Sequence, residues 1–214
     1  MPRKISTTLA EQVMKSTRRA VSVEREVRKI GTDDLIPSGS TLLNLACSDN
    51  PYGAYGLGKI VTLPGTSSAG KTLLMLTTFA EAHKLKRLNE HEFIYDDVEA
   101  ALEFDLAYLF GKGVAERIQE PPQGCSDTIE HFKSNIMTLA EKGKPFIYCL
   151  DSFDALSSDA ELEKEMRKAL TMAKSEEAAK KIAGSFGTEK AKIAGQVLRM
   201  VKQELQRTNS LLIM

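Results

Sequence analysis

Apolar residues along the chain follow two spacings, which predict alternating strands and helices from residue 59 onward. Short continuous apolar runs indicate buried strands, at residues 59–65, 92–97, 146–150 and 209–214. Apolar residues three or four apart indicate amphipathic helices, at residues 71–85, 127–142 and 191–207. Gly143 is placed to end the second of these helices. The order predicts an α/β fold, with helices flanking a mostly parallel central sheet.

The remaining segments have weaker patterns. Residues 5–20 are predicted to form a short helix that is too small to fold alone, so it should dock on the core or on a neighbouring subunit. Residues 48–58 are predicted as a turn-rich loop. Residues 159–182 are charged and alanine-rich and are predicted as a helix or as a broken helix. Residues 183–190 contain two glycines close together and are predicted as a flexible loop.

Composition narrows the class of protein without selecting a partner. The chain has 214 residues with 29 basic and 29 acidic side chains, so its net charge does not indicate a nucleic acid or a membrane. Residues 1–30 and 180–207 are locally basic, a pattern that is more often a solvated surface than a binding site. The three cysteines are widely spaced, which favours a reducing, cytoplasmic setting over a disulfide framework or a zinc site. No apolar run approaches the ~20 residues that span a membrane, so we expect a soluble protein.

The octapeptide GTSSAGKT fits the pattern G-x-x-x-x-G-K-[ST], with a predicted strand before it and a predicted helix after it. This context predicts a phosphate-binding loop rather than a chance match in a turn. Backbone N–H groups of such a loop and the positive end of the following helix hold nucleotide phosphates. Lys71 is expected to reach the β and γ phosphates, and Thr72 to ligate Mg²⁺. The predicted nucleotide-binding residues of the loop are Gly65, Thr66, Ser67, Ser68, Ala69, Gly70, Lys71 and Thr72.

Acidic residues follow two of the predicted strands. Asp151 comes directly after the apolar run 146–150, which places its carboxylate at the end of a central strand where ligands of α/β sheets bind. We interpret Asp151 as a second Mg²⁺ residue, with a helix N-cap as the alternative. Hydrolysis also needs a carboxylate that orients or deprotonates the attacking water. Spacing alone leaves four candidates in the segment YDDVEAALE: Asp96, Asp97, Glu99 and Glu103.

Six segments together resemble the ATPase core of the RecA-type recombinases, in order and in approximate spacing, over residues 36–214. They are IPSGSTLLNLA (36–46), GLGKIVTLPGTSSAGKTLL (56–74), FIYDDVEAALE (93–103), FIYCLDSFDAL (146–156), AELEKEM (160–166) and TNSLLIM (208–214). The resemblance implies ATP and Mg²⁺ as cofactors, with Glu99 and Lys71 as catalytic residues. It also implies that Glu103 approaches the adenine edge. Leu106 stands where the family commonly stacks a tyrosine on the adenine.

The same resemblance implies a DNA-binding loop within residues 164–192, longer than in the usual bacterial members. Its candidate DNA contacts are Lys180, Lys181, Phe186, Lys190 and Lys192. The implied partners are single-stranded DNA and further copies of the chain in a head-to-tail filament. We expect residues 1–33 to form an N-terminal docking helix and linker. Residues 34–214 are expected to form the RecA-like core, ending before the distal part of that domain.

The leading interpretation is therefore an ATP-dependent DNA recombinase, or a core fragment of one, acting in homologous recombination and repair. Because the distal region of the family is missing, we expect the activity of this chain alone to be impaired. Two alternatives share the ATPase core: a nucleotide-binding regulatory relative without strand exchange, and a ring-forming helicase-type motor. DNA-stimulated hydrolysis would separate a motor from a binder.

Overall fold

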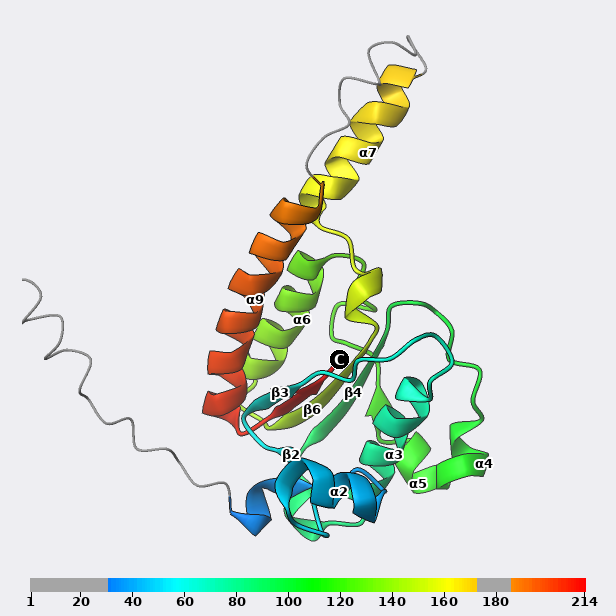
Figure 1. Ribbon diagram of the computed structural model, residues 1–214, viewed down its shortest axis with the longest axis vertical. Coiled ribbons are helices and arrows are strands. Elements are labelled where there is room, and N and C mark those ends of the chain that lie inside the picture. Colours follow the sequence, from blue (N-terminus) through cyan, green and yellow to red (C-terminus); the bar gives the residue numbers. More distant parts are fainter. Residues whose placement is uncertain (1–30, 173–185) are drawn as a thin grey trace, which may run out of the picture. The chain divides into compact units, whose positions relative to one another are not determined.

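A five-stranded parallel sheet is the centre of the computed structural model, which describes residues 31–172 and 186–214 (Figure 1). The strand order is β3-β7-β6-β4-β5, and the four neighbouring pairs are all parallel. The strands are β3 (Lys59–Val61), β4 (Glu92–Asp97), β5 (Ile118–Gln119), β6 (Phe146–Asp151) and β7 (Leu211–Ile213). A separate antiparallel pair consists of β1 (Leu35–Ile36) and β2 (Tyr55–Gly56). The predicted α/β fold with a parallel sheet is confirmed.

Helices cover both faces of this sheet. Those of the described chain are α2 (Thr41–Ser48), α3 (Lys71–His83), α4 (Leu106–Phe110), α5 (Lys112–Ala115), α6 (Ile129–Glu141), α7 (Asp159–Met172) and α9 (Phe186–Thr208). Three short 3₁₀ helices are η1 (Thr32–Asp34), η2 (Lys86–Leu88) and η3 (Phe153–Ala155). Figure 1 shows α6 and α9 together on one side of the sheet and α3 on the other. The right-handed crossovers of parallel strands require this distribution of helices.

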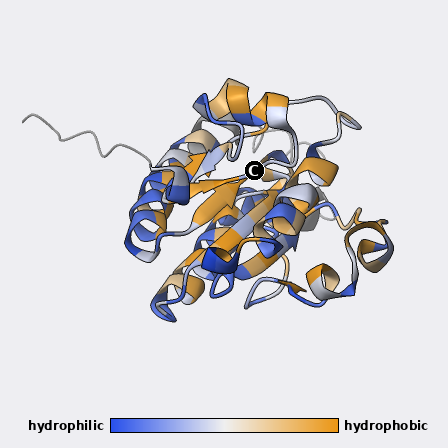
Figure 2. Ribbon diagram, turned by 90° about the horizontal axis from the view of Figure 1, so that it is seen from below, coloured by the Kyte–Doolittle hydropathy of each residue, from blue (hydrophilic) through white to orange (hydrophobic). Residues whose placement is uncertain are grey.

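Each face of the sheet has its own apolar core. Alternate residues of β4 point to opposite faces, so Phe93 and Tyr95 pack with Met75 and Phe79 of α3. Ile94 joins the second core, which α6 and α9 complete. The central strand β6 is buried along its whole length, as its uninterrupted apolar run predicts. Figure 2 shows the hydrophobic strands between helices whose outer sides are hydrophilic.

The predicted bounds agree closely with the observed ones for the strands of the sheet and for the helices that flank it. The predicted strand 92–97 matches β4, and the predicted helix 127–142 contains α6, which Gly143 follows with a positive φ of 71°. The predicted helix at residues 5–20 lies outside the described residues.

Residues 183–190 were predicted as a loop, and this prediction is wrong for residues 186–190, which form the start of α9. The buried positions Val197, Val201 and Leu205 anchor one face of that helix in the core. Helix formation is cooperative, so a helix anchored in its second half can extend back through Gly187 at a cost of about 1 kcal/mol.

Helix α2 was not predicted, although its first turn carries a recognisable signal. Ser40 caps the helix, because its hydroxyl oxygen accepts a hydrogen bond from the backbone N–H of Leu43. Asn44 is the buried residue of α2, and its side chain amide bonds to Ser38 and to the backbone oxygen of Pro51. No helix in the described part of the chain is long and apolar enough to cross a membrane.

Candidate nucleotide-binding site

The glycine loop connects β3 to α3 at the carboxyl end of the sheet. Gly70 is the N-cap of α3 and has a φ of 86°, a backbone conformation that residues with a Cβ rarely adopt. A Cβ on Gly65 would lie 3.2 Å from the Cβ of Ala69, so the loop is closely wound at this point. Backbone N–H groups of the loop and the positive end of the 13-residue helix α3 therefore meet at one exposed place, which suits an anion.

Lys71 lies in the first turn of α3 and reaches back over the loop. Its Nζ atom donates hydrogen bonds to the backbone oxygens of Gly65 and Thr66, each 3.0 Å away. These bonds keep a positive charge above the loop. Both bonds are exposed to solvent. A bound phosphate carries a full negative charge, so Lys71 can exchange these bonds for a stronger interaction with the phosphate.

Thr72 and Asp151, which sequence analysis assigned to Mg²⁺, are brought together although they are far apart in the sequence. The Thr72 hydroxyl donates a hydrogen bond of 2.5 Å to Oδ2 of Asp151. Asp151 is the final residue of β6, and its side chain is 8% exposed. A buried carboxylate is stable only with hydrogen-bond partners or opposite charge. Here Tyr95 of β4 supplies a second donor, with its hydroxyl 3.0 Å from the same oxygen.

Glu99 lies on the loop after β4, next to these residues. Its Oε1 atom accepts a hydrogen bond of 2.6 Å from the hydroxyl of Ser152. The backbone N–H groups of Val98 and Glu99 donate to the backbone oxygen of Asp151 at 3.0 and 3.4 Å. Asp97 holds the other side of the loop, because its carboxylate accepts hydrogen bonds from two backbone N–H groups, those of Ala101 and Leu102. Glu99 is exposed. The hydrogen bonds of its loop and the bond from Ser152 fix the position of its carboxylate.

A cleft of about 630 Å³ runs across these groups, a volume in the usual range for small-molecule sites. The lining residues include the glycine loop, Glu99, Asp151 and Ser152. Phe104 is 43% exposed and also lines the cleft, an aromatic residue that sequence analysis did not single out. The list of lining residues is Gly65, Ser67, Ser68, Ala69, Gly70, Lys71, Thr72, Leu73, Glu99, Ala101, Phe104, Asp151, Ser152 and Asp154.

The two residues expected near the adenine are placed differently. Leu106 packs against the apolar core on the α3 side of the sheet. Glu103 is exposed and is not among the residues that line the cleft. The contact of Glu103 with adenine stays a prediction.

The donor set fits a Mg²⁺ ion that arrives with a nucleotide. Among the described residues, no group of three or more His, Cys, Asp or Glu side chains could hold a metal on its own. Mg²⁺ commonly takes one or two protein oxygens together with substrate phosphates. A hydroxyl and a carboxylate beside a phosphate-binding loop provide such a partial set, namely Thr72 and Asp151.

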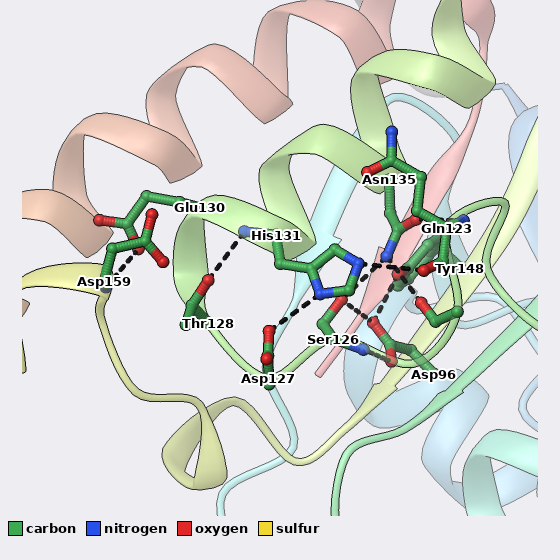
Figure 3. Close-up of polar contacts among 11 residues, drawn as sticks. Asp96, Gln123, Ser126, Asp127, Thr128, Glu130, His131, Asn135, Tyr148 and Asp159 are labelled. Carbon is green, nitrogen blue, oxygen red and sulfur yellow. Dashed lines mark hydrogen bonds and ion pairs between the residues drawn. The ribbon is translucent and has the colours of Figure 1, made fainter. Parts of the chain in front are cut away.

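A second aspartate, Asp96, lies one strand away from Asp151 but is sealed inside the protein. Its oxygens accept hydrogen bonds from the Ser126 backbone N–H (2.8 Å), the Ser126 hydroxyl (2.7 Å) and the Tyr148 hydroxyl (2.5 Å). The Asn135 amide donates to the Ser126 hydroxyl oxygen at 3.1 Å. Figure 3 shows these four side chains converging behind the loop that enters α6. Asp96 is 0% exposed, so it is a structural residue and not a candidate for water activation.

Burial acts on the tyrosines of both clusters. It raises the pKa of Tyr95 and of Tyr148 well above 10, and the nearby carboxylates of Asp151 and Asp96 add to the effect. Both phenols are therefore protonated near neutral pH and act as hydrogen-bond donors.

The RecA N-terminal domain family matches residues 5–214 of this chain, almost its whole length. The chain belongs to the RecA family. It is similar to Protein RecA of Oceanobacillus iheyensis, with 36% identity over 143 residues, which are 67% of this chain and 37% of the relative. It is also similar to Protein RecA of Xanthomonas axonopodis pv. citri, with 29% identity over 186 residues, 87% of this chain and 46% of the relative. The chain thus spans less than half the length of these curated RecA relatives.

The residues that the RecA resemblance assigned to DNA are only partly described. Lys180 and Lys181 lie outside the described residues, and Phe186 is the first residue of α9. Lys190 donates a hydrogen bond from Nζ to the backbone oxygen of Asp154 at 3.3 Å, next to the cleft. Lys192, two residues further along α9, is exposed.

Proposed function

We propose that this chain is the ATP-binding and ATP-hydrolysing core of a RecA-type DNA recombinase. The observation that most supports it is the meeting of the Thr72 hydroxyl and the Asp151 carboxylate at 2.5 Å beside the glycine loop. Glu99 lies on the same cleft. A phosphate site, a partial metal site and an exposed carboxylate in one cleft are the parts that phosphoryl transfer to water needs.

The roles of the residues follow from their positions. Backbone N–H groups of the glycine loop and the start of α3 bind the phosphates, and Lys71 exchanges its bonds to loop carbonyl oxygens for bonds to phosphate oxygens. Thr72 and Asp151 hold Mg²⁺, which when bound neutralises phosphate charge. Glu99 orients the attacking water and accepts its proton, while Ser152 fixes the direction of that carboxylate.

The proposed partners are single-stranded DNA and further copies of the chain in a filament, acting in the cytoplasm. Helix α9 supports the DNA contact, because its residues, 186–208, contain five basic side chains and two acidic side chains. Helix α7, residues 159–172, contains four acidic and three basic side chains. Basic α9 is therefore the better candidate for following a phosphate backbone.

Turnover of ATP with and without single-stranded DNA tests the proposal. Glu99→Gln keeps the shape of the side chain but cannot accept a proton, so turnover should fall by roughly 10²-fold or more while ATP binding is retained. Glu116→Gln is a matched control, since Glu116 is 66% exposed and lies outside the cleft. Mg²⁺-dependent ATP binding without DNA-stimulated turnover would instead support the regulatory relative.

The DNA contact has its own test. Lys192→Ala should weaken binding of single-stranded DNA. It should also reduce the slope of the logarithm of the binding constant against the logarithm of the salt concentration by about 1, which corresponds to the loss of one phosphate contact. Lys144→Ala is the control, because Lys144 is also exposed but precedes β6, at the amino end of the sheet. Equal effects of the two substitutions would reject α9 as the DNA-binding face.

A further inference from the structure

Tyr95 joins the apolar core to the nucleotide cleft. Its side chain is 4% exposed and packs in the core on the α3 side of the sheet, while its hydroxyl reaches Asp151 Oδ2 at 3.0 Å. The ring is fixed by this packing, so the hydroxyl has a defined position. Nothing in the sequence pattern distinguishes Tyr95 from an ordinary core residue of a buried strand.

The hydrogen bonds of Asp151 are unevenly divided between its two oxygens. Oδ2 accepts from both Thr72, at 2.5 Å, and Tyr95, at 3.0 Å. No described residue donates to the other oxygen, Oδ1. Two donors on one oxygen restrict rotation of the carboxylate and leave the second oxygen available to a cation or to its water shell.

We propose that Tyr95 is a positioning residue for Mg²⁺ binding, which it favours by holding the Asp151 carboxylate against Thr72. The inference rests on the proposed function, because the cation arrives with the nucleotide. Tyr95 does not touch the nucleotide phosphates in this scheme. It acts through Asp151, as residues that hydrogen-bond to a metal ligand commonly do.

The protein contains a matched comparison for this role. Tyr148 of β6 is also fully buried and also donates its hydroxyl to an aspartate, Asp96, at 2.5 Å. Figure 3 shows that this bond belongs to the sealed cluster with Ser126. Tyr95→Phe and Tyr148→Phe therefore remove the same atom from similar surroundings, and only Tyr95→Phe removes a bond to Asp151.

The experiment is the binding of a fluorescent ATP analogue to the whole chain over a range of Mg²⁺ concentrations. Tyr95→Phe should raise the Mg²⁺ concentration for half-maximal binding by about 10-fold, and binding should recover at high Mg²⁺. Tyr148→Phe should leave that concentration unchanged. Circular dichroism of both variants checks that they are folded. Electron paramagnetic resonance of Mn²⁺ with a non-hydrolysable ATP analogue should show the same difference without any turnover.

The outcomes separate this inference from the proposed function. A shift with Tyr95→Phe alone supports the positioning role. A shift of equal size in both variants, in neither, or in Tyr148→Phe alone overturns it. If the unchanged protein binds no nucleotide with Mg²⁺, the proposed function fails instead.

Discussion

Asp96 on β4 and Asp151 on β6 lie near the carboxyl ends of two neighbouring parallel strands, yet their surroundings differ. The register pairs Asp97 with Asp151, so Asp96 is one step inside the sheet. Asp96 has three hydrogen-bond donors from Ser126 and Tyr148, and it is 0% exposed. Asp151 has two donors, both on one oxygen, and it lines a cleft.

The difference shows that one sheet holds the same side chain in two chemically different surroundings. A carboxylate whose oxygens are fully supplied with donors stabilises the protein and binds nothing else. A carboxylate with an oxygen left over can bind a cation that arrives with a substrate. A change of Asp96 should therefore mainly lower stability, whereas a change of Asp151 should mainly weaken cation binding.

The largest effect is expected on turnover, from Asp151→Asn. The amide has no negative charge to offer Mg²⁺, so ATP hydrolysis should fall by roughly 10³-fold, equivalent to about 4 kcal/mol. Urea unfolding of the same variant should show a much smaller change. A variant that hydrolyses ATP normally would show that Asp151 does not hold the cation.

The next largest effect is on stability, from Asp96→Asn. The amide nitrogen is a donor and would face other donors, so the free energy of unfolding should fall by about 3 kcal/mol. Urea denaturation measures this directly. A normal rate of ATP hydrolysis per folded molecule would support a purely structural role for Asp96. A loss of turnover in the folded molecules would contradict it.

His91 is a buried titratable side chain of a third kind, because its shifted pKa arises without a carboxylate partner. Burial, with smaller contributions from Arg117 and Arg87, lowers the pKa of His91 to about 4. The unfolded chain therefore binds more protons between pH 6.5 and pH 4, and stability should fall as the pH decreases through this window. The loss should be about 2 kcal/mol between pH 7.5 and pH 5. His91→Leu should flatten the pH dependence of urea unfolding there, and an unchanged slope would contradict the assignment.

The smallest effect is expected from Tyr148→Phe. Loss of one of three donors to Asp96 should reduce the free energy of unfolding by about 1 kcal/mol. Thermal or urea unfolding measures the change, with Tyr108→Phe as control, because Tyr108 is 86% exposed. A loss as large as that of Asp96→Asn would mean that the Ser126 bonds contribute little.

Much of the fold was predictable because strong local patterns coincide with elements of the sheet. The run 146–150 is apolar throughout and forms the core of β6, and the glycine loop lies between β3 and α3 as its pattern requires. The prediction of a loop is wrong for residues 186–190, because the two glycines of residues 183–190 are a strong local signal and the packing of α9 is not visible in the sequence.

The site was predictable in its parts but not in its arrangement. Spacing could not choose among the acidic residues of YDDVEAALE, and alternation along β4 is the signal that would have placed Asp96 inside and Tyr95 on the other face. The bonds of Ser152 to Glu99 and of Tyr95 to Asp151 join residues more than 50 positions apart. No local pattern encodes such contacts, and only the folded sheet brings them together.

The position of β7 in the sheet has a consequence for the order of folding during synthesis. Among the described residues, β3 lies at one edge of the sheet and leads into the glycine loop. Its neighbour in the sheet is β7, and β7 separates it from β6. Residues 211–213 leave the ribosome long after residues 59–61, so β3 cannot pair with β7 until both segments have been synthesised. β4 and β6 can pair earlier, and their exposed edge then needs protection from other chains. The strand that leads into the glycine loop therefore depends for its pairing on residues 211–213, which lie far from it in the sequence.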